Sequence, residues 1–274
     1  MKILKKPILA VLIFLLSQAG FGMLAGLIAN PAPPILLAAS LLLSGLVTIF
    51  ALYRMHMIHE STIHPWRISW RYVHLGIISV MLGIFAADLI SSFFQLPDLM
   101  RMEFNEMANS TWGVLAMVVI APIVEEVVFR ESVLGYMIRH GANYWLAIFL
   151  SALLFGIVHF NPAQIPFAFF IGILLGIVYV KSKSILLTGF IHMLNNFLAV
   201  KEMQFLGDTY SEFNFTSILG YRLTEIYIVV CIVLCVLFMM EFVKKYHRPS
   251  DEHRRHHHHH HHSSLKEPND DENE

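Results

Sequence analysis

The feature that most constrains this chain is a series of long apolar stretches separated by short polar segments. Of its 274 residues, 56% are hydrophobic and only 14% are charged, whereas a soluble domain is usually about 25% charged. Apolar stretches of roughly 20 residues are long enough to cross a bilayer as helices. The sequence therefore predicts an all-α protein that crosses a membrane several times.

We expect about eight transmembrane helices, with boundaries set by the polar segments between them. They cover residues 7–28, 34–53, 73–96, 112–129, 144–160, 164–180, 184–200 and 218–242. The first stretch follows Lys2, Lys5 and Lys6 and so begins like a signal peptide. Its apolar length of about 20 residues fits a retained transmembrane helix instead.

The distribution of basic residues predicts which side of the membrane each end faces. If the amino terminus is cytoplasmic, the cytoplasmic segments together carry 13 lysines and arginines, and the opposite loops carry 3. Because positive residues are retained on the cytoplasmic side, we expect both termini in the cytoplasm. The net charge of −1 gives no reason to expect a nucleic-acid partner.

Residues 1–246 form the expected transmembrane domain, and residues 247–274 differ sharply from it. This tail is polar, contains a run of histidines at 256–262 and ends in acidic residues, so we expect it to be disordered. Whether the histidine run is native or a purification tag is left open. Cys231 and Cys235 share one helix face and are expected to be apolar fillers rather than a disulfide or a zinc site.

Two adjacent glutamates, Glu125 and Glu126, lie in the fourth expected helix. A carboxylate at the centre of a transmembrane helix costs about 2.5–3.5 kcal/mol on insertion scales, so the pair requires a compensating environment. Glu126 and Arg130 are four residues apart and can meet on one helix face. We expect Arg130 to compensate Glu126, which leaves Glu125 to face a polar cavity. The alternative is that both glutamates are solvated at the helix end.

Polar residues also occur in two later helices. His159 ends an apolar stretch, and His192 and Asn196 lie four residues apart, so they project from one helix face. A carboxylate and a histidine can take a proton from water, or can hold a metal that acidifies bound water. A histidine and an amide can stabilise a developing oxyanion. Together these groups are suited to hydrolysing an amide bond.

Three motifs on successive helices, Glu-Glu-x-x-x-Arg, Phe-x-x-x-His and His-x-x-x-Asn, lie within residues 112–200. Their order resembles that of the CAAX-protease and bacteriocin-processing (CPBP, or Abi) family of intramembrane proteases, and is similar to type II CAAX prenyl endopeptidases. The resemblance implies an eight-helix fold in which Glu125 and His159 activate water. It also implies that His192 and Asn196 stabilise the oxyanion.

The resemblance implies supporting roles for Glu126 and Arg130 and leaves two mechanisms open. In the first, a divalent metal such as zinc takes part, and Glu125, His159 and His192 are the candidate ligands. In the second, the glutamate and histidine act without a metal.

One residue departs from the family pattern, and the estimated depth of His159 in the membrane does not match that of Glu125. Many family members have a small residue directly after the motif arginine, whereas this chain has Glu131, and we expect this to alter local packing. A helix rise of about 1.5 Å per residue places Glu125 about 8 Å above Arg130 and His159 about 22 Å above Tyr144. His159 is then too high to meet Glu125 unless the fourth helix continues well past Arg130.

Other residues inside the expected helices have structural interpretations. Asp88 is expected to line a cavity or to pair with another polar group. Gly22 and Gly26, and likewise Gly172 and Gly176, have the four-residue spacing that favours close helix packing.

The leading interpretation is an intramembrane endopeptidase in a bacterial plasma membrane, acting on a membrane-associated peptide or protein. Two alternatives stay open. One is a non-proteolytic bacteriocin-immunity or scaffold protein of the same family. The other is a transporter that uses the intramembrane carboxylates for proton coupling.

Overall fold

The computed structural model describes residues 2–59, 70–91, 93–94, 96–207 and 215–245, and within these ranges the chain forms helices and no strand. Six helical segments are long and apolar enough to cross a membrane. They are Lys5–Ile28 (α1), Pro34–Arg54 (α2), Val73–Ser91 (in α3, Trp70–Ser91), Thr111–Arg139, Ile165–Ser182 (α9) and Tyr221–Lys244 (in α12, Tyr221–Lys245). These helices confirm the prediction of an all-α membrane protein.

The other two expected spans are helical but do not meet the same criteria. Helix α8, Tyr144–Ile157, is apolar but has only 14 residues, which gives it a length of about 21 Å against the roughly 30 Å of a bilayer core. Helix α10, Ile185–Leu206, has 22 residues but carries a histidine and two asparagines in its middle. Eight spans and the orientation of the termini therefore stay predictions.

One continuous helix, Thr111–Arg139, runs through the centre of the molecule and changes its winding along its length. It consists of α5 (Thr111–Leu115), the π-helical η4 (Ala116–Ile120), α6 (Ala121–Glu125), the π-helical η5 (Glu126–Gly135) and α7 (Tyr136–Arg139). Such wide turns are rare and occur frequently at functional sites. The two adjacent glutamates lie where α6 passes into η5.

This helix continues ten residues past the expected end at 129, which resolves the depth of His159. The central helix extends nine residues beyond Arg130, so α8, which follows it, starts about 13 Å below the level of Arg130. His159 then lies about 9 Å above the level of Arg130, close to the height of Glu125. A hydrogen bond of 2.8 Å from the Ser151 hydroxyl to the Phe129 carbonyl ties α8 to the central helix at this register.

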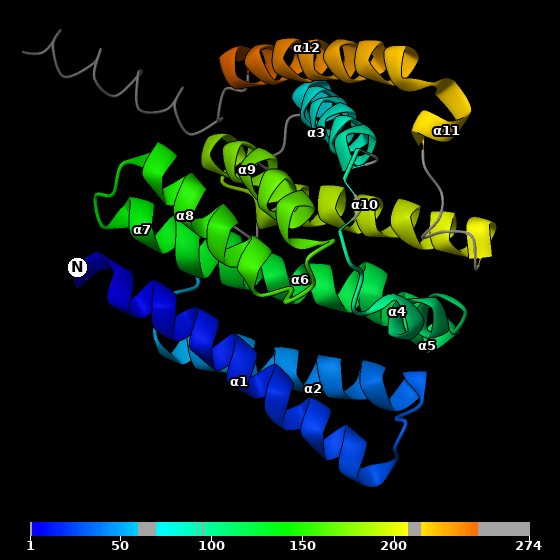
Figure 1. Cartoon of the computed structure of the whole chain (residues 1–274). Coiled ribbons are helices and arrows are strands. Elements are labelled where there is room, and N and C mark those ends of the chain that lie inside the picture. Colours follow the sequence, from blue (N-terminus) through cyan, green and yellow to red (C-terminus); the bar gives the residue numbers. More distant parts are fainter. Residues whose placement is uncertain (1, 60–69, 92, 95, 208–214, 246–274) are drawn as a thin grey trace, which may run out of the picture.

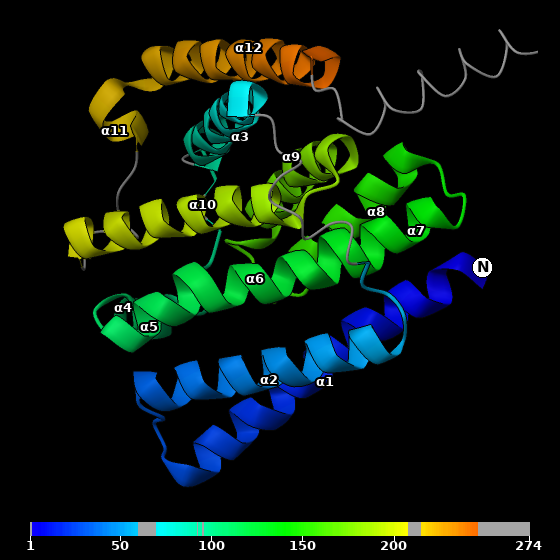
Figure 2. The same ribbon diagram turned by 180° about the vertical axis from the view of Figure 1, so that it is seen from behind.

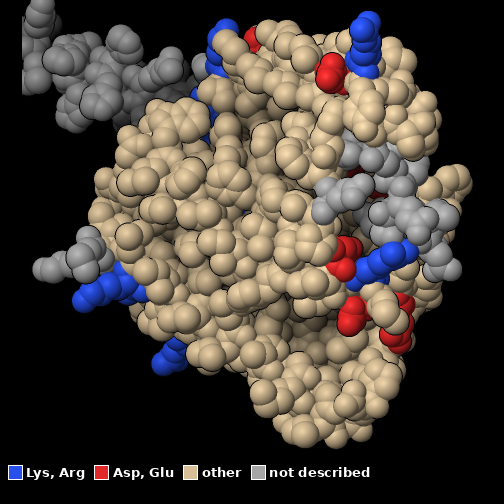
Figure 3. All heavy atoms as spheres, viewed as in Figure 1, with Lys and Arg blue, Asp and Glu red and all other residues tan. Residues whose placement is uncertain are grey.

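The remaining helices pack around the central one (Figures 1 and 2). Helices α1 and α2 form a hairpin on one side, α8 and α9 form a second hairpin, and α3 and α12 form an outer layer next to α9 and α10. The short helices α4 (Arg101–Ala108) and α11 (Phe215–Leu219) lie near the far end of α10. On the face shown in Figure 3, charged side chains lie mainly near the edges of a broad uncharged area, as expected for a protein embedded in a bilayer.

The two predicted glycine pairs have different outcomes. A Cβ on Gly172 would lie 2.9 Å from the Ala152 Cα, so close packing of α8 and α9 depends on this glycine. By contrast, nothing lies within 4 Å of a Cβ built on Gly22 or Gly26. The prediction of close packing was wrong for that pair, because the end of α1 diverges from the rest of the bundle (Figure 1).

Candidate active site

The junction between α6 and η5 separates the two glutamates into different environments. Glu126 is fully buried, and its Oε2 atom lies 3.4 Å from the Nε atom of Arg130, which is also fully buried. The side chain of Glu125 keeps 16% of its surface exposed. Arg130 therefore lies beside Glu126 as expected, while Glu125 is the more accessible carboxylate of the two.

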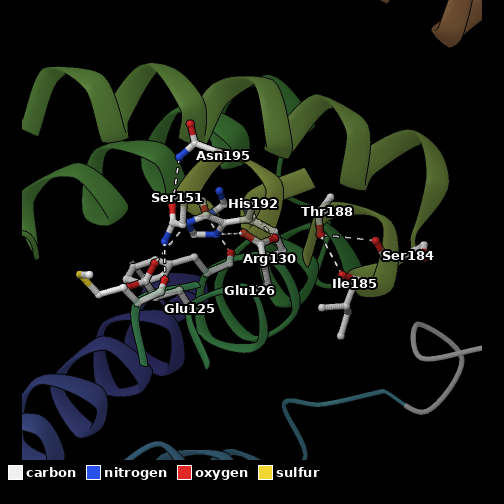
Figure 4. Close-up of polar contacts among 12 residues, drawn as sticks. Glu125, Glu126, Arg130, Ser151, Ser184, Ile185, Thr188, His192 and Asn195 are labelled. Carbon is white, nitrogen blue, oxygen red and sulfur yellow. Dashed lines mark hydrogen bonds and ion pairs between the residues drawn. The ribbon is translucent and has the colours of Figure 1, made fainter. Parts of the chain in front are cut away.

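His192 on α10 lies between the two glutamates (Figure 4). Its Nδ1 atom is 3.0 Å from the Oε1 atom of Glu126, and its Nε2 atom is 3.6 Å from the Oε2 atom of Glu125. An ionised carboxylate only accepts hydrogen bonds, so Nδ1 of His192 donates to Glu126 and the ring orientation is fixed. Nε2 of His192 is consequently directed toward Glu125.

Asn196 lies one helical turn beyond His192. Its amide nitrogen donates to the Met117 carbonyl oxygen at 2.8 Å, and its side-chain oxygen accepts from the amide of Asn195 at 3.0 Å. Met117 belongs to the π-helical η4, so Asn196 links α10 to the central helix. The amide nitrogen of Asn195 thus bonds to its neighbour on the same helix.

His159 reaches the same region at the end of α8. Its Nδ1 atom is 2.7 Å from the Phe155 carbonyl oxygen and must donate to it, so a neutral ring carries an unprotonated Nε2. Within the described part of the chain, no hydrogen bond or ion pair joins His159 to Glu125, Glu126 or His192. The structure therefore brings the two glutamates and His192 into direct contact and leaves His159 beside them.

The aromatic ring of Phe155 is the contact that the two histidines share. His159 meets this ring edge-on at a centroid distance of 5.0 Å, and His192 does so at 5.6 Å. The guanidinium of Arg130 lies over the same ring, 4.6 Å from its centroid. Phe155 belongs to the second sequence motif, but its position alone did not reveal that it would connect these three side chains.

The predicted metal ligands do not converge. In the part of the chain that the structure describes, no group of three or more His, Cys, Asp or Glu side chains is arranged so that it could hold a metal ion. Glu125 and His192 approach each other, but His159 is held by the Phe155 carbonyl. The metal-dependent mechanism therefore stays a prediction.

A second buried charge cluster surrounds Glu131, which the sequence marked only as a departure from the family pattern. Glu131 is fully buried and accepts hydrogen bonds from Nη1 of Arg139 at 2.8 Å, from the backbone N–H of His59 at 3.0 Å and from the Tyr179 hydroxyl. Gly135 makes room for the cluster, because a Cβ there would lie 2.6 Å from the Tyr179 hydroxyl oxygen. The carboxylate thus joins the segment that follows α2, the central helix and α9.

The fold and the site define an integral membrane protein in which polar side chains of the central helix and α10 meet inside an apolar bundle, the class to which intramembrane peptidases belong. Residues 107–198 match the family model described as type II CAAX prenyl endopeptidase Rce1-like. This match confirms the resemblance drawn from the three motifs and supports a membrane peptidase of CAAX type in general. Every predicted site residue lies inside the matched segment.

Two bacterial relatives are similar over part of their length. The UPF0177 protein YbdI of Lactococcus lactis is 41% identical over 91 residues, which is 30% of this chain and 47% of that protein. The "Putative membrane peptidase YdiL" of Bacillus subtilis is 28% identical over 87 residues, which is 31% of this chain and 35% of that protein. The chain thus spans less than half the length of the curated relatives it matches. No solved structure matches this chain.

Proposed function

We propose that this protein is an intramembrane endopeptidase that hydrolyses a peptide bond of a membrane-associated peptide or protein. The observation that carries the proposal is His192 held between Glu125 and Glu126 inside the bundle. A buried histidine flanked by two carboxylates is costly in an apolar environment. Ionisable residues at such positions therefore usually serve a function. The match of this region to a peptidase family adds independent support.

In the proposed reaction, Glu125 accepts one proton of a water molecule, and Nε2 of His159 accepts a hydrogen bond from the same water and orients it. The hydroxide adds to the carbonyl carbon of the scissile bond, and the carbonyl oxygen takes up the negative charge. When the C–N bond breaks, the same proton passes to the leaving amine. Glu125 suits this role because it is the partly exposed member of the carboxylate pair and can be reached by water.

His192 and Asn196 are proposed to stabilise the oxyanion. Nδ1 of His192 is engaged with Glu126, so His192 donates from Nε2 only as an imidazolium. Asn196 has two amide hydrogens and uses one for the Met117 carbonyl, which leaves a second donor for the oxyanion.

Glu126 and Arg130 are proposed to act on His192 rather than on the substrate. Both side chains are fully buried, so neither contacts a substrate directly. The hydrogen bond from His192 fixes the ring, and Arg130 balances the charge of Glu126. We propose a bacterial plasma membrane as the location, because the two relatives are bacterial.

A comparison of membrane proteomes tests the proposal. Cells carrying the wild type are compared with cells carrying Glu125→Ala, and peptide termini that disappear in the variant are identified. Glu106→Ala is the matched control, because Glu106 is an exposed glutamate on α4 away from the site. We expect termini to be lost in Glu125→Ala and retained in Glu106→Ala. Full cellular function of a well-expressed Glu125→Ala protein would contradict the proposal and favour a scaffold or immunity role.

A further inference from the structure

The turn between α8 and α9 carries His159 and is held in a compact form. Helix α8 ends at Ile157 and α9 begins at Ile165, so the chain reverses within a short segment. The two helices approach closely at Gly156, where a Cβ would lie 2.9 Å from the Ile165 carbonyl oxygen. The orientation of His159 therefore depends on the backbone of this turn.

The residue after His159 has a strained backbone. Phe160 adopts a positive φ of 50°, in the left-handed region that a bulky side chain rarely occupies. The residue is 61% exposed, so packing of its side chain does not enforce this conformation. Such a conformation persists only where the surrounding structure over-determines it, and it occurs often at functional sites. Some other contact must hold the turn.

Asn161 supplies that contact. Its side chain is fully buried, its amide nitrogen donates to Oδ1 of Asp98 at 2.8 Å, and its side-chain oxygen accepts from the backbone N–H of Leu99 at 3.1 Å. Oδ1 of Asp98 also accepts from the backbone N–H of Met100 at 3.1 Å. The side-chain amide of Asn161 thus bonds through both its nitrogen and its oxygen to the segment between α3 and α4.

We propose that these hydrogen bonds, the Asp98–Asn161 clasp, position His159 for hydrolysis. This inference rests on the proposed function for its catalytic meaning, but the clasp itself is a claim about the geometry of one side chain. Asn161 is a positioning residue, because it acts through the turn and does not reach the reacting atoms. The α3–α4 segment then becomes part of the active-site framework although no sequence motif lies in it.

The physical consequence of losing the clasp follows from the strain. Without the Asn161 side chain, the N–H of Leu99 loses its acceptor, and Phe160 is released to the right-handed region that bulky residues prefer. That change moves the turn that follows His159, and we expect the His159 ring then to lose its fixed contact with Phe155. A misplacement of about 1 Å in a catalytic group can cost about 10²-fold in rate.

The imidazole tautomer of His159 reports the clasp without any substrate. We would label the full chain with ¹⁵N-histidine in lipid nanodiscs and assign the signal by its loss in His159→Gln. In the wild type, the bond to the Phe155 carbonyl predicts the Nδ1–H tautomer. In Asn161→Ala we expect a mixture of tautomers, as in a histidine exposed to solvent.

Two further sets of variants separate positioning from a general loss of stability. Asn143 caps the opposite end of α8 by accepting from the N–H groups of Trp145 and Leu146, so Asn143→Ala weakens the same helix but should leave the His159 tautomer unchanged. At the other partner, Asp98→Asn keeps an acceptor for Asn161 and should behave as the wild type, whereas Asp98→Ala should not. This pair provides the test if Asn161→Ala does not fold.

The results for the clasp and for the proposed function can be told apart. An unchanged His159 tautomer in Asn161→Ala or Asp98→Ala overturns the clasp, whatever the activity of the protein. If the clasp holds and the protein is a peptidase, Asn161→Ala loses the same peptide termini as Glu125→Ala, and Asp98→Asn retains them. A changed tautomer with no loss of termini in Glu125→Ala supports the clasp and contradicts the proposed function.

Discussion

Replacement of Arg139 by methionine tests the buried charge cluster around Glu131. Removing one partner of a buried ion pair typically costs about 3–5 kcal/mol, because it leaves an uncompensated charge. In Arg139→Met the remaining charge is the Glu131 carboxylate, whose side chain is fully buried. Its other partners, the Tyr179 hydroxyl and the His59 N–H, are neutral. We therefore expect the full loss of about 3–5 kcal/mol in this variant.

The reverse replacement should cost less. In Glu131→Gln the remaining charge belongs to Arg139, whose side chain is 28% exposed and can turn toward solvent. A glutamine oxygen in the Oε1 position keeps an acceptor for the His59 N–H, and the amide nitrogen in the Oε2 position can donate to the Tyr179 oxygen. We expect a loss of about 1–3 kcal/mol, the cost of an imperfectly paired buried group.

The double variant measures the interaction between the two side chains. Its loss should be smaller than the two single losses together by about 1–3 kcal/mol, because the second replacement removes a charge that the first left unpaired. Unfolding in mixed micelles, followed by circular dichroism, gives these differences, with the exposed Glu106→Gln as a control expected within about 0.5 kcal/mol of wild type. Strictly additive single losses, or a larger loss in Glu131→Gln than in Arg139→Met, would refute the reasoning.

Three further predictions use the same unfolding assay. Gly45→Ala should cost about 1–3 kcal/mol, because its Cβ would lie 2.5 Å from a valine methyl group on α6. The control Gly22→Ala has nothing within 4 Å of its Cβ and should be close to neutral. Equal losses of stability in the two variants would contradict the packing. Glu126→Ala should cost about 3–5 kcal/mol because it leaves the buried Arg130 without its counter-charge, and an unchanged stability would contradict the pairing. Burial raises the pKa of the Glu202 carboxyl, so the folded state binds that proton more tightly than the unfolded state. Stability should therefore fall as pH rises through and above the ordinary range of a glutamate, and Glu202→Gln should show no such fall at this site.

Local spacing predicted those parts of the site that lie on a single helix. Glu126 and Arg130 are four residues apart and pair as expected, and the helix through Arg139 places His159 at the height of Glu125. The length of the apolar stretches also located the six spans. These features depend on residues close together in the sequence, which is why the sequence could reveal them.

The contacts between helices could not be derived in this way. His192 was expected to act together with Asn196 on its own helix, but its hydrogen bond is to Glu126, 66 positions away. Nothing in a 3.6-residue period indicates the π-helical winding of η5. The partners of Glu131, which include Tyr179 on α9, likewise depend on how the helices pack.

Turns were the least predictable parts. The expected fifth span, 144–160, is a helix of only 14 residues followed by a turn with a left-handed Phe160. Asn161 and Asp98 lie 63 positions apart and belong to no motif, so only the folded structure brings them together. The histidine run at 256–262 lies outside the described residues, so the prediction for the tail stays as it was.

The most direct test of the central claim is peptide cleavage by the purified protein in liposomes. The substrate is a synthetic peptide spanning a cleavage site identified by the proteome comparison, and the compared proteins are the wild type, Glu125→Gln and the exposed-site control Glu106→Gln. We predict that the wild type and the control release the same new termini and that Glu125→Gln, with unchanged stability, loses at least about 10²-fold in rate, the contribution of a general base. Cleavage by Glu125→Gln at the wild-type rate would contradict the assignment of Glu125 as the group that activates water.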